Sequence, residues 1–205
     1  ALLATNTSSI PLEELSTALA KPERLIGLHF FNPVPQLPLV EVIRGRDTRD
    51  AEIEKGCAVV TAINKYPLIV KSVPGFLVNR VLAPYMMYAM QRHEEGLSRE
   101  KIDEAAKTFG MPVGPLELAD QVGLDICKHV ADILGLQSSS IEASKLATLV
   151  ASGKLGKKSG EGFYVWKDGK PERQATKEPF DPVELDRLGK ELTKPLIDEC
   201  EKCVA

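Results

Sequence analysis

The pattern of apolar residues changes at Pro74-Gly75, and this change restricts the possible folds more than any other feature. Before it, apolar runs of strand length alternate with segments in which apolar residues recur at helical spacing. After it, the helical spacing continues and strand-length runs nearly cease. Alternating strands and helices predict a layered α/β sheet, whereas successive helices predict a helical domain. We therefore expect two parts that meet near residue 74.

The same patterns predict the individual elements. In the first part we expect strands over residues 1–5, 25–31, 39–44 and 68–71, with helices beginning near Pro11 and over 50–65. In the second part Ser98 is a helix N-cap, because its hydroxyl can accept from a backbone amide of the first turn. The expected helices of that part cover 78–95, 99–108, 115–121, 125–134 and 141–152.

Composition excludes several classes of function. The chain has 205 residues, of which 43% are hydrophobic and 27% charged, with a net charge of −3. Its basic residues are dispersed, so no basic patch is expected for nucleic acid. No apolar run approaches the roughly 20 residues of a membrane span. Cys200-x-x-Cys203 lacks a second pair of ligands, so we expect no metal site there.

Two ionisable residues fall inside the apolar runs expected to be strands. His29 lies in the 25–31 run, and Glu41 interrupts the apolar run 39–43. A buried carboxylate needs a partner, and an imidazole is a partner whose basicity it raises. The pair would make a general base with its orienting acid. A satisfied core histidine and an edge-strand glutamate would give the same pattern, so the two residues alone leave both interpretations open.

Six longer strings, taken together, closely resemble the L-3-hydroxyacyl-CoA dehydrogenase family in content and order. They are Ala-Thr-Asn-Thr-Ser-Ser at 4–9, Gly-Leu-His-Phe-Phe-Asn-Pro-Val-Pro at 27–35, Leu-Val-Glu-Val-Ile at 39–43, Pro-Gly-Phe-Leu-Val-Asn-Arg at 74–80, Met-Pro-Val-Gly-Pro-Leu-Glu-Leu-Ala-Asp at 111–120 and Gly-Lys-Lys-Ser-Gly-Glu-Gly-Phe-Tyr at 156–164. The resemblance implies NAD-dependent oxidation of (S)-3-hydroxyacyl-CoA to 3-ketoacyl-CoA in fatty-acid β-oxidation.

The resemblance also implies roles for particular residues. His29 would be the general base, and Glu41 would bond its other ring nitrogen. Ser8 would donate to the substrate oxygen close to the nicotinamide, and Asn79 would bond the reacting oxygen or the thioester region.

Two further residues match family positions on the cofactor side. Asn32 corresponds to a nicotinamide-side contact, and Lys158 to a lysine that approaches the cofactor from the helical domain. Without the resemblance, Lys158 would be interpreted as a solvated loop charge.

The fold implied is an α/β remnant of a Rossmann-type NAD-binding domain followed by the all-α C-terminal domain of the family. Residues 1–73 would be the C-terminal part of the NAD-binding domain, and 74–166 a helical domain for substrate binding and dimerisation. Residues 167–205 would be a linker and the start of a second helical repeat, because 194–200 weakly echo 83–89. Such a repeat resembles fused enoyl-CoA hydratase/3-hydroxyacyl-CoA dehydrogenase enzymes.

One departure concerns the cofactor site. The family's Gly-x-Gly-x-x-Gly turn, which cradles the pyrophosphate of the dinucleotide, occurs nowhere in this sequence. The sequence also begins at Ala1 without an initiator Met, so we expect a fragment of a longer polypeptide. Alone, it would lack most of the NAD site and be inactive.

The expected partners follow from the same resemblance. They are the 3-hydroxyacyl-CoA substrate, a second copy bound through the helical domain, and a thiolase subunit in the parent complex, in the cytoplasm of a bacterium or in peroxisomes or mitochondria of a eukaryote. The apolar stripe Leu82, Met86 and Met90 supports the homodimer. Two alternatives stay open: an inactive helical assembly fragment, and a relative that acts on a non-CoA hydroxy acid such as gulonate.

Overall fold

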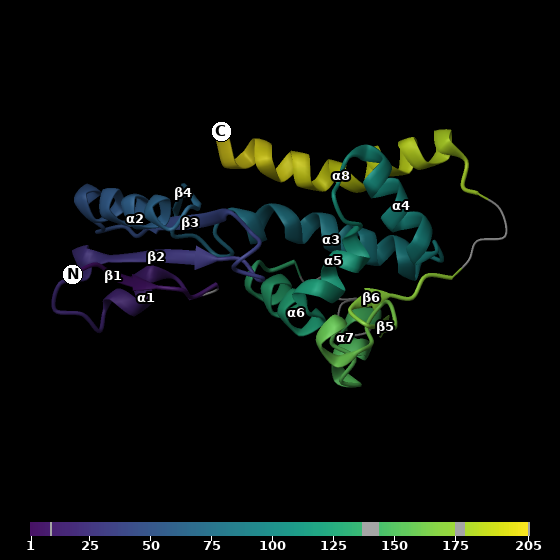
Figure 1. The fold of residues 1–205 in the computed structure, drawn as a ribbon, viewed down its shortest axis with the longest axis horizontal. Coiled ribbons are helices and arrows are strands. Elements are labelled where there is room, and N and C mark those ends of the chain that lie inside the picture. The colour runs from purple at the N-terminus through teal and green to yellow at the C-terminus, as the bar shows by residue number, and fades with distance from the viewer. Residues whose placement is uncertain (9, 137–143, 175–178, 205) are drawn as a thin grey trace. The chain divides into compact units, whose positions relative to one another are not determined.

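The computed structural model describes residues 1–8, 10–136, 144–174 and 179–204, and the chain divides into two compact units, residues 1–80 and 81–205 (Figure 1). The division falls a little beyond Pro74-Gly75, where the sequence pattern changes. Residues 141–143 of the helix expected over 141–152, and 175–178 of the expected linker, lie outside the described residues.

The first unit contains a four-stranded sheet in the order β1-β2-β3-β4. Strands β1 and β2 are parallel, β3 is antiparallel to β2, and β4 is parallel to β3. The carboxyl ends of β1 and β2 therefore share one edge of the sheet with the beginning of β3. The strand bounds are Leu3–Thr5 for β1, Leu25–Phe30 for β2, Leu39–Arg44 for β3 and Tyr66–Lys71 for β4.

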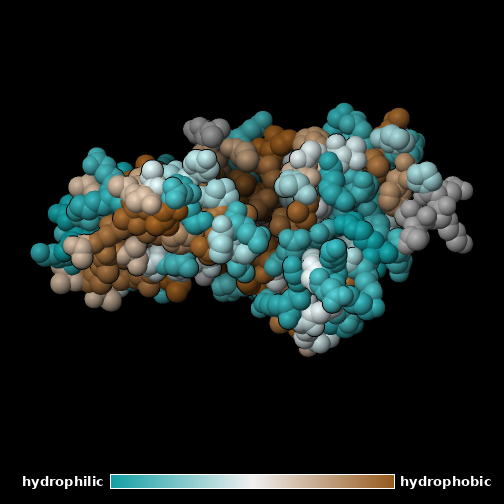
Figure 2. Space-filling view, viewed as in Figure 1, coloured by the Kyte–Doolittle hydropathy of each residue, from teal (hydrophilic) through white to brown (hydrophobic). Residues whose placement is uncertain are grey.

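Apolar residues cover both faces of this sheet, because successive side chains of a strand point to opposite faces. Helix α2 (Asp50–Ala62) places Ile53 and Val60 in a cluster with the even-numbered residues of β2 and β3. Helix α1 (Leu12–Ser16) places Leu12 in a second cluster with Leu25 and Ile43, which are odd-numbered. The side chains at odd-numbered positions of β2 and β3 thus lie on the face of the sheet that α1 covers. Figure 2 shows hydrophobic surface over this unit, at the left of the view. Val59, Ile63 and Ile69 are exposed apolar residues of the same unit.

The second unit is largely helical. Helix α8 packs along α4, and Gly189 of α8 makes this contact possible, because a Cβ there would lie 2.5 Å from the carbonyl oxygen of Ala105. The Ser98 side chain accepts from Lys101 N at 3.3 Å, so the predicted N-cap is confirmed. The bounds are Val78–Glu94 for α3, Arg99–Phe109 for α4, Pro115–Val122 for α5, Leu124–Ile133 for α6, Lys145–Ala151 for α7, Pro182–Val204 for α8, Trp166–Lys167 for β5 and Lys170–Pro171 for β6.

The core of this unit uses the apolar stripe that the sequence suggested for a partner. Met86 and Met90 are buried in the core, and Leu82 packs against it. Met86 and Met90 therefore do not support a dimer interface, because the unit's own helices cover their side chains. The expected fold class, a short α/β segment followed by a largely helical domain, is confirmed.

In the described part of the chain, no helix combines the length and apolar character needed to cross a membrane.

Candidate active site

His29 and Glu41 are direct cross-strand neighbours. In the antiparallel ladder of β2 and β3 their Cα atoms are register partners, so both side chains emerge on the same face of the sheet. His29 Nδ1 lies 2.7 Å from Glu41 Oε2, and both residues are buried. A carboxylate only accepts hydrogen bonds, so Nδ1 carries the ring hydrogen. Nε2 is then the ring nitrogen available to take a proton.

Backbone amides hold the other oxygen of Glu41. Leu77 N and Val78 N donate to Oε1 at 3.0 and 2.9 Å, and Val78 is the first residue of α3. A carboxylate at a helix N-terminus is stabilised by these amides and by the helix dipole. Glu41 is fully buried, yet both of its oxygens have partners. This arrangement explains how a charged residue is tolerated inside an apolar strand.

Two phenylalanines enclose the imidazole ring. The Phe31 ring centroid lies 4.6 Å from that of His29 in an edge-on arrangement, and the Phe76 centroid lies 5.6 Å away. The sequence pattern assigned no role of its own to Phe31 or Phe76. The signal that could have found Phe76 is its place in the Pro-Gly-Phe string that precedes α3.

Three other predicted site residues lie on segments next to this pair. Ser8 and Asn32 are exposed and follow the carboxyl ends of β1 and β2. Asn6 Oδ1 accepts from Phe30 N at 3.0 Å, which ties the segment after β1 to the end of β2. Asn79 is half-buried and directly follows Val78, which donates to Glu41. The first unit therefore supplies five of the six predicted residues.

Lys158, the sixth predicted residue, belongs to the second unit. It is exposed, and its Nζ lies 2.5 and 2.7 Å from the two carboxylate oxygens of Asp125. The hydrogen bond from Lys158 is the main influence that lowers the pKa of Asp125 below its ordinary value. The side chain is thus engaged by a surface carboxylate of its own unit.

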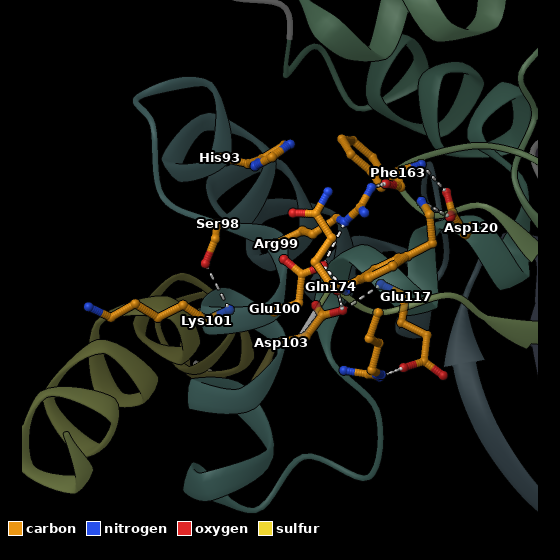
Figure 3. Close-up of polar contacts among 12 residues, drawn as sticks. His93, Ser98, Arg99, Glu100, Lys101, Asp103, Glu117, Asp120, Phe163 and Gln174 are labelled. Carbon is orange, nitrogen blue, oxygen red and sulfur yellow. Dashed lines mark hydrogen bonds and ion pairs between the residues drawn. The ribbon is translucent and has the colours of Figure 1, made fainter. Parts of the chain in front are cut away.

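The second unit also contains a buried polar cluster around Asp103 and Asp120 (Figure 3). Asp120 accepts from the backbone amides of Phe163 and Tyr164 and from the indole of Trp166, each at 2.9 Å. Asp103 accepts from two amides at the start of α5 and from the Tyr164 hydroxyl. Burial raises the pKa of Asp120, and it raises that of Asp103 to about 6.

These two carboxylates act as structural anchors. Each accepts three hydrogen bonds from the fold itself. Asp103 joins the start of α5 and Tyr164 to α4, and Asp120 joins the 163–166 segment to α5. Among the described residues, no group of three or more His, Cys, Asp or Glu side chains could hold a metal ion. The His29–Glu41 pair places an imidazole against a buried carboxylate, a combination that can accept a proton.

Comparisons with known protein families give two matches along the chain. A family model described as "3-hydroxyacyl-CoA dehydrogenase, NAD binding domain" matches residues 1–73, and one described as "3-hydroxyacyl-CoA dehydrogenase, C-terminal domain" matches residues 75–166. The chain belongs to the 3-hydroxyacyl-CoA dehydrogenase family.

Among curated relatives, the fatty acid oxidation complex subunit alpha of Idiomarina loihiensis is 40% identical over 204 residues. The match covers 96% of this chain and 28% of that protein, so the chain spans about a quarter of the length of such relatives. The corresponding subunit of a Pseudomonas putida strain is 39% identical over 203 residues and matched over 27% of its length.

Solved structures of the family have the same fold. The 3-hydroxybutyryl-CoA dehydrogenase of Escherichia coli K12 superposes with a TM-score of 0.74 at 40% identity, covering 85% of this chain and 38% of that chain. The (S)-3-hydroxybutyryl-CoA dehydrogenase of Ralstonia eutropha also has a TM-score of 0.74, at 41% identity, covering 82% of this chain and 61% of that one.

The residues present fit one end of the NAD that this family binds. Ligands of α/β sheets bind beyond the carboxyl ends of the strands, where Ser8 and Asn32 offer an exposed hydroxyl and an exposed amide. Such groups can hydrogen-bond the carboxamide of a nicotinamide. The pyrophosphate end has no equivalent cradle, because the sequence contains no Gly-x-Gly-x-x-Gly.

Proposed function

We propose that the chain carries the catalytic base of an NAD-dependent dehydrogenase that oxidises (S)-3-hydroxyacyl-CoA to 3-ketoacyl-CoA in fatty-acid β-oxidation. The observation that supports this most strongly is the buried 2.7 Å contact between His29 Nδ1 and Glu41 Oε2. This contact fixes the tautomer in which Nδ1 carries the hydrogen, so Nε2 is free to act as a base. A base is needed to remove the proton of the substrate hydroxyl.

The roles of the residues follow from the chemistry of the oxidation. In the oxidation, carbon 3 of the substrate loses a hydride and its hydroxyl loses a proton. NAD, when bound, would supply the hydride acceptor. His29 Nε2 takes the proton, and Glu41 stabilises the imidazolium that results. Ser8 donates to the substrate oxygen close to the nicotinamide, and Asn79 hydrogen-bonds the reacting oxygen or the thioester region.

Cofactor contacts, domain roles and partners belong to the same proposal. Asn32 contacts the nicotinamide side, and Lys158 approaches the cofactor when released from Asp125. Residues 1–73 contribute to NAD binding, 74–166 to substrate binding and dimerisation, and 167–205 form a linker and the beginning of a second helical repeat. A thiolase subunit as partner and a cytoplasmic location belong to the proposal through the resemblance to the family. The relatives are bacterial fatty acid oxidation complex alpha subunits, which supports a place in such a complex.

The test is a His29→Gln substitution in the complete protein, with NADH formation from a 3-hydroxyacyl-CoA as the readout. Loss of the base should lower the rate by about 10²- to 10⁴-fold. His129→Gln is the matched control, because His129 is exposed on α6 of the other unit. Near-normal turnover by a folded His29→Gln variant would contradict the proposal.

A panel of hydroxy acids with and without CoA separates the substrate classes. Activity confined to CoA esters supports the proposal, whereas activity on gulonate supports the non-CoA alternative. A complete wild-type protein without any dehydrogenase activity would favour an assembly role.

A further inference from the structure

Phe76 has a backbone conformation that residues other than glycine rarely adopt. Its φ is 51°, directly after Gly75 with a φ of 73°, and the side chain is buried. A bulky residue in the left-handed region is held there only when its surroundings compensate for the strain. Strain of this kind concentrates at functional sites, so its consequences at Phe76 are informative.

The backbone of this turn determines where two amide groups point. Phe76 N donates to Val73 O at 2.9 Å, which closes the turn before α3 begins. The next two amides, those of Leu77 and Val78, then donate to Glu41 Oε1 at 3.0 and 2.9 Å. A residue 76 in an ordinary right-handed or extended conformation would send the following amides in another direction.

The ring of the same residue contacts the other member of the pair. Its centroid lies 5.6 Å from that of the His29 imidazole, with an angle of 60° between the ring planes. Phe76 therefore touches His29 through its side chain and directs amides to Glu41 through its backbone. The two influences act on the two partners of one hydrogen bond.

We propose that Phe76 is a positioning residue of the dehydrogenase, which fixes the His29–Glu41 pair through its left-handed backbone and its ring. This inference rests on the proposed function of that pair. A residue that merely filled the core would need apolar volume but no left-handed backbone. Phe76 combines a strained backbone, a buried side chain and contacts to both His29 and Glu41, and this combination indicates a role in addition to core packing.

Two substitutions separate the contributions of backbone and ring. Phe76→Gly removes the ring but keeps the turn, because glycine adopts a positive φ without strain. Phe76→Ile keeps apolar volume but is β-branched, so it disfavours the turn and should withdraw the amides from Glu41. Asn64→Ile is the matched control, because Asn64 has a φ of 58° in an exposed turn of the same unit.

The first readout is the tautomer of His29, measured from the ring ¹⁵N chemical shifts of the chain. The chain has three histidines, so His29→Gln assigns the signals. Phe76→Ile should give a mixture of tautomers, whereas Phe76→Gly should keep the Nδ1–H form. Asn64→Ile should keep it too, although its melting temperature should fall.

The second readout is the kinetics of the complete protein. For Phe76→Ile we expect kcat to fall on the order of 100-fold with KM for the acyl-CoA unchanged, and for Phe76→Gly a smaller fall, on the order of tenfold. If Phe76→Ile does not fold, Phe76→Gly still tests the ring. Wild-type tautomer and wild-type kcat in every folded Phe76 variant would overturn the inference, even if His29→Gln is inactive. A changed tautomer in a protein whose activity does not depend on His29 would instead support the positioning and refute the proposed function.

Discussion

Tyr164 donates its hydroxyl hydrogen to Asp103 Oδ2 at 2.8 Å, and this bond joins positions 61 residues apart in the core of the second unit. Asp103 also accepts from Leu116 N and Glu117 N, at 2.9 and 3.1 Å. The carboxylate has three donors, yet burial is the dominant influence and raises its pKa to about 6. The core is therefore tied together by a group that titrates in an accessible pH range.

Asp103 should make the stability of the fold depend on pH. Because its folded pKa of about 6 lies above the ordinary 3.8, its contribution is fully present below pH 3.8 and is lost as the pH rises through 6. The loss should be about 3 kcal/mol, at about 1.4 kcal/mol for each tenfold change in proton affinity. Urea unfolding at a series of pH values between about 4 and 8 measures it.

Asp103→Asn is the comparison for this prediction. The amide keeps the shape and cannot titrate, but its single oxygen leaves one of the two backbone amides, Leu116 N or Glu117 N, without an acceptor, at a cost of about 1 to 3 kcal/mol. Its stability should be lower than that of the wild type and should change less between pH 4 and pH 8. Parallel curves for the two proteins would show that Asp103 does not titrate in this range.

Glu41→Gln should damage the base by reversing its tautomer. The two amides that bind Oε1 require the amide oxygen of Gln at that position, so the NH₂ group faces His29 Nδ1. Nδ1 must then accept, and Nε2 carries the hydrogen. We expect the oxidation rate to fall by about 10²- to 10⁴-fold.

A second buried glutamate provides the control for this substitution. Glu52 on α2 is 2% exposed and pairs with Lys55 at 3.0 Å, away from His29. Glu52→Gln should leave the rate unchanged. If Glu41→Gln behaves in the same way, Glu41 is a structural residue only.

Lys158 and Asp125 provide a test of the cofactor contact. If Lys158 reaches the cofactor, Lys158→Ala should raise the KM for NAD on the order of tenfold, the loss of one charge-assisted hydrogen bond. Asp125→Asn frees the same lysine and should leave that KM equal or lower. Steady-state kinetics with NAD as the varied substrate distinguish the two, and an unchanged KM in Lys158→Ala would show that the lysine serves only its surface ion pair.

The proposed homodimer has to use a surface other than the buried methionines of α3. A groove of about 790 Å³ in the second unit is lined in part by Pro84, Met87 and Tyr88 of α3 and by Pro195 of α8. Sedimentation equilibrium should show a dimer at micromolar concentration, and Met87→Lys should shift it toward monomer, because a charge would be buried. A monomer at the highest soluble concentration of the wild type would contradict the homodimer.

Local patterns in the sequence were sufficient for most helices and strands. Strand β3 occupies the predicted residues Leu39–Arg44, and Ser98 caps α4 as expected. Both features depend on residues only a few positions apart. The helix predicted over 50–65 ends earlier, at Ala62, because Asn64 turns into the left-handed region with a φ of 58°.

The sequence by itself also identified His29 and Glu41, through strings that resemble a family, and marked both as anomalies in apolar strands. Only the tertiary structure decided their geometry, because the register of β2 against β3 and the strained turn at Phe76 set which groups face each other. Asp103 carried no such local signal: its donors lie 13 to 61 residues away, on segments that meet only in the folded core. Local periodicity reports which face of an element is buried. The partners of a buried charge depend on contacts between distant segments, which no short window of sequence contains.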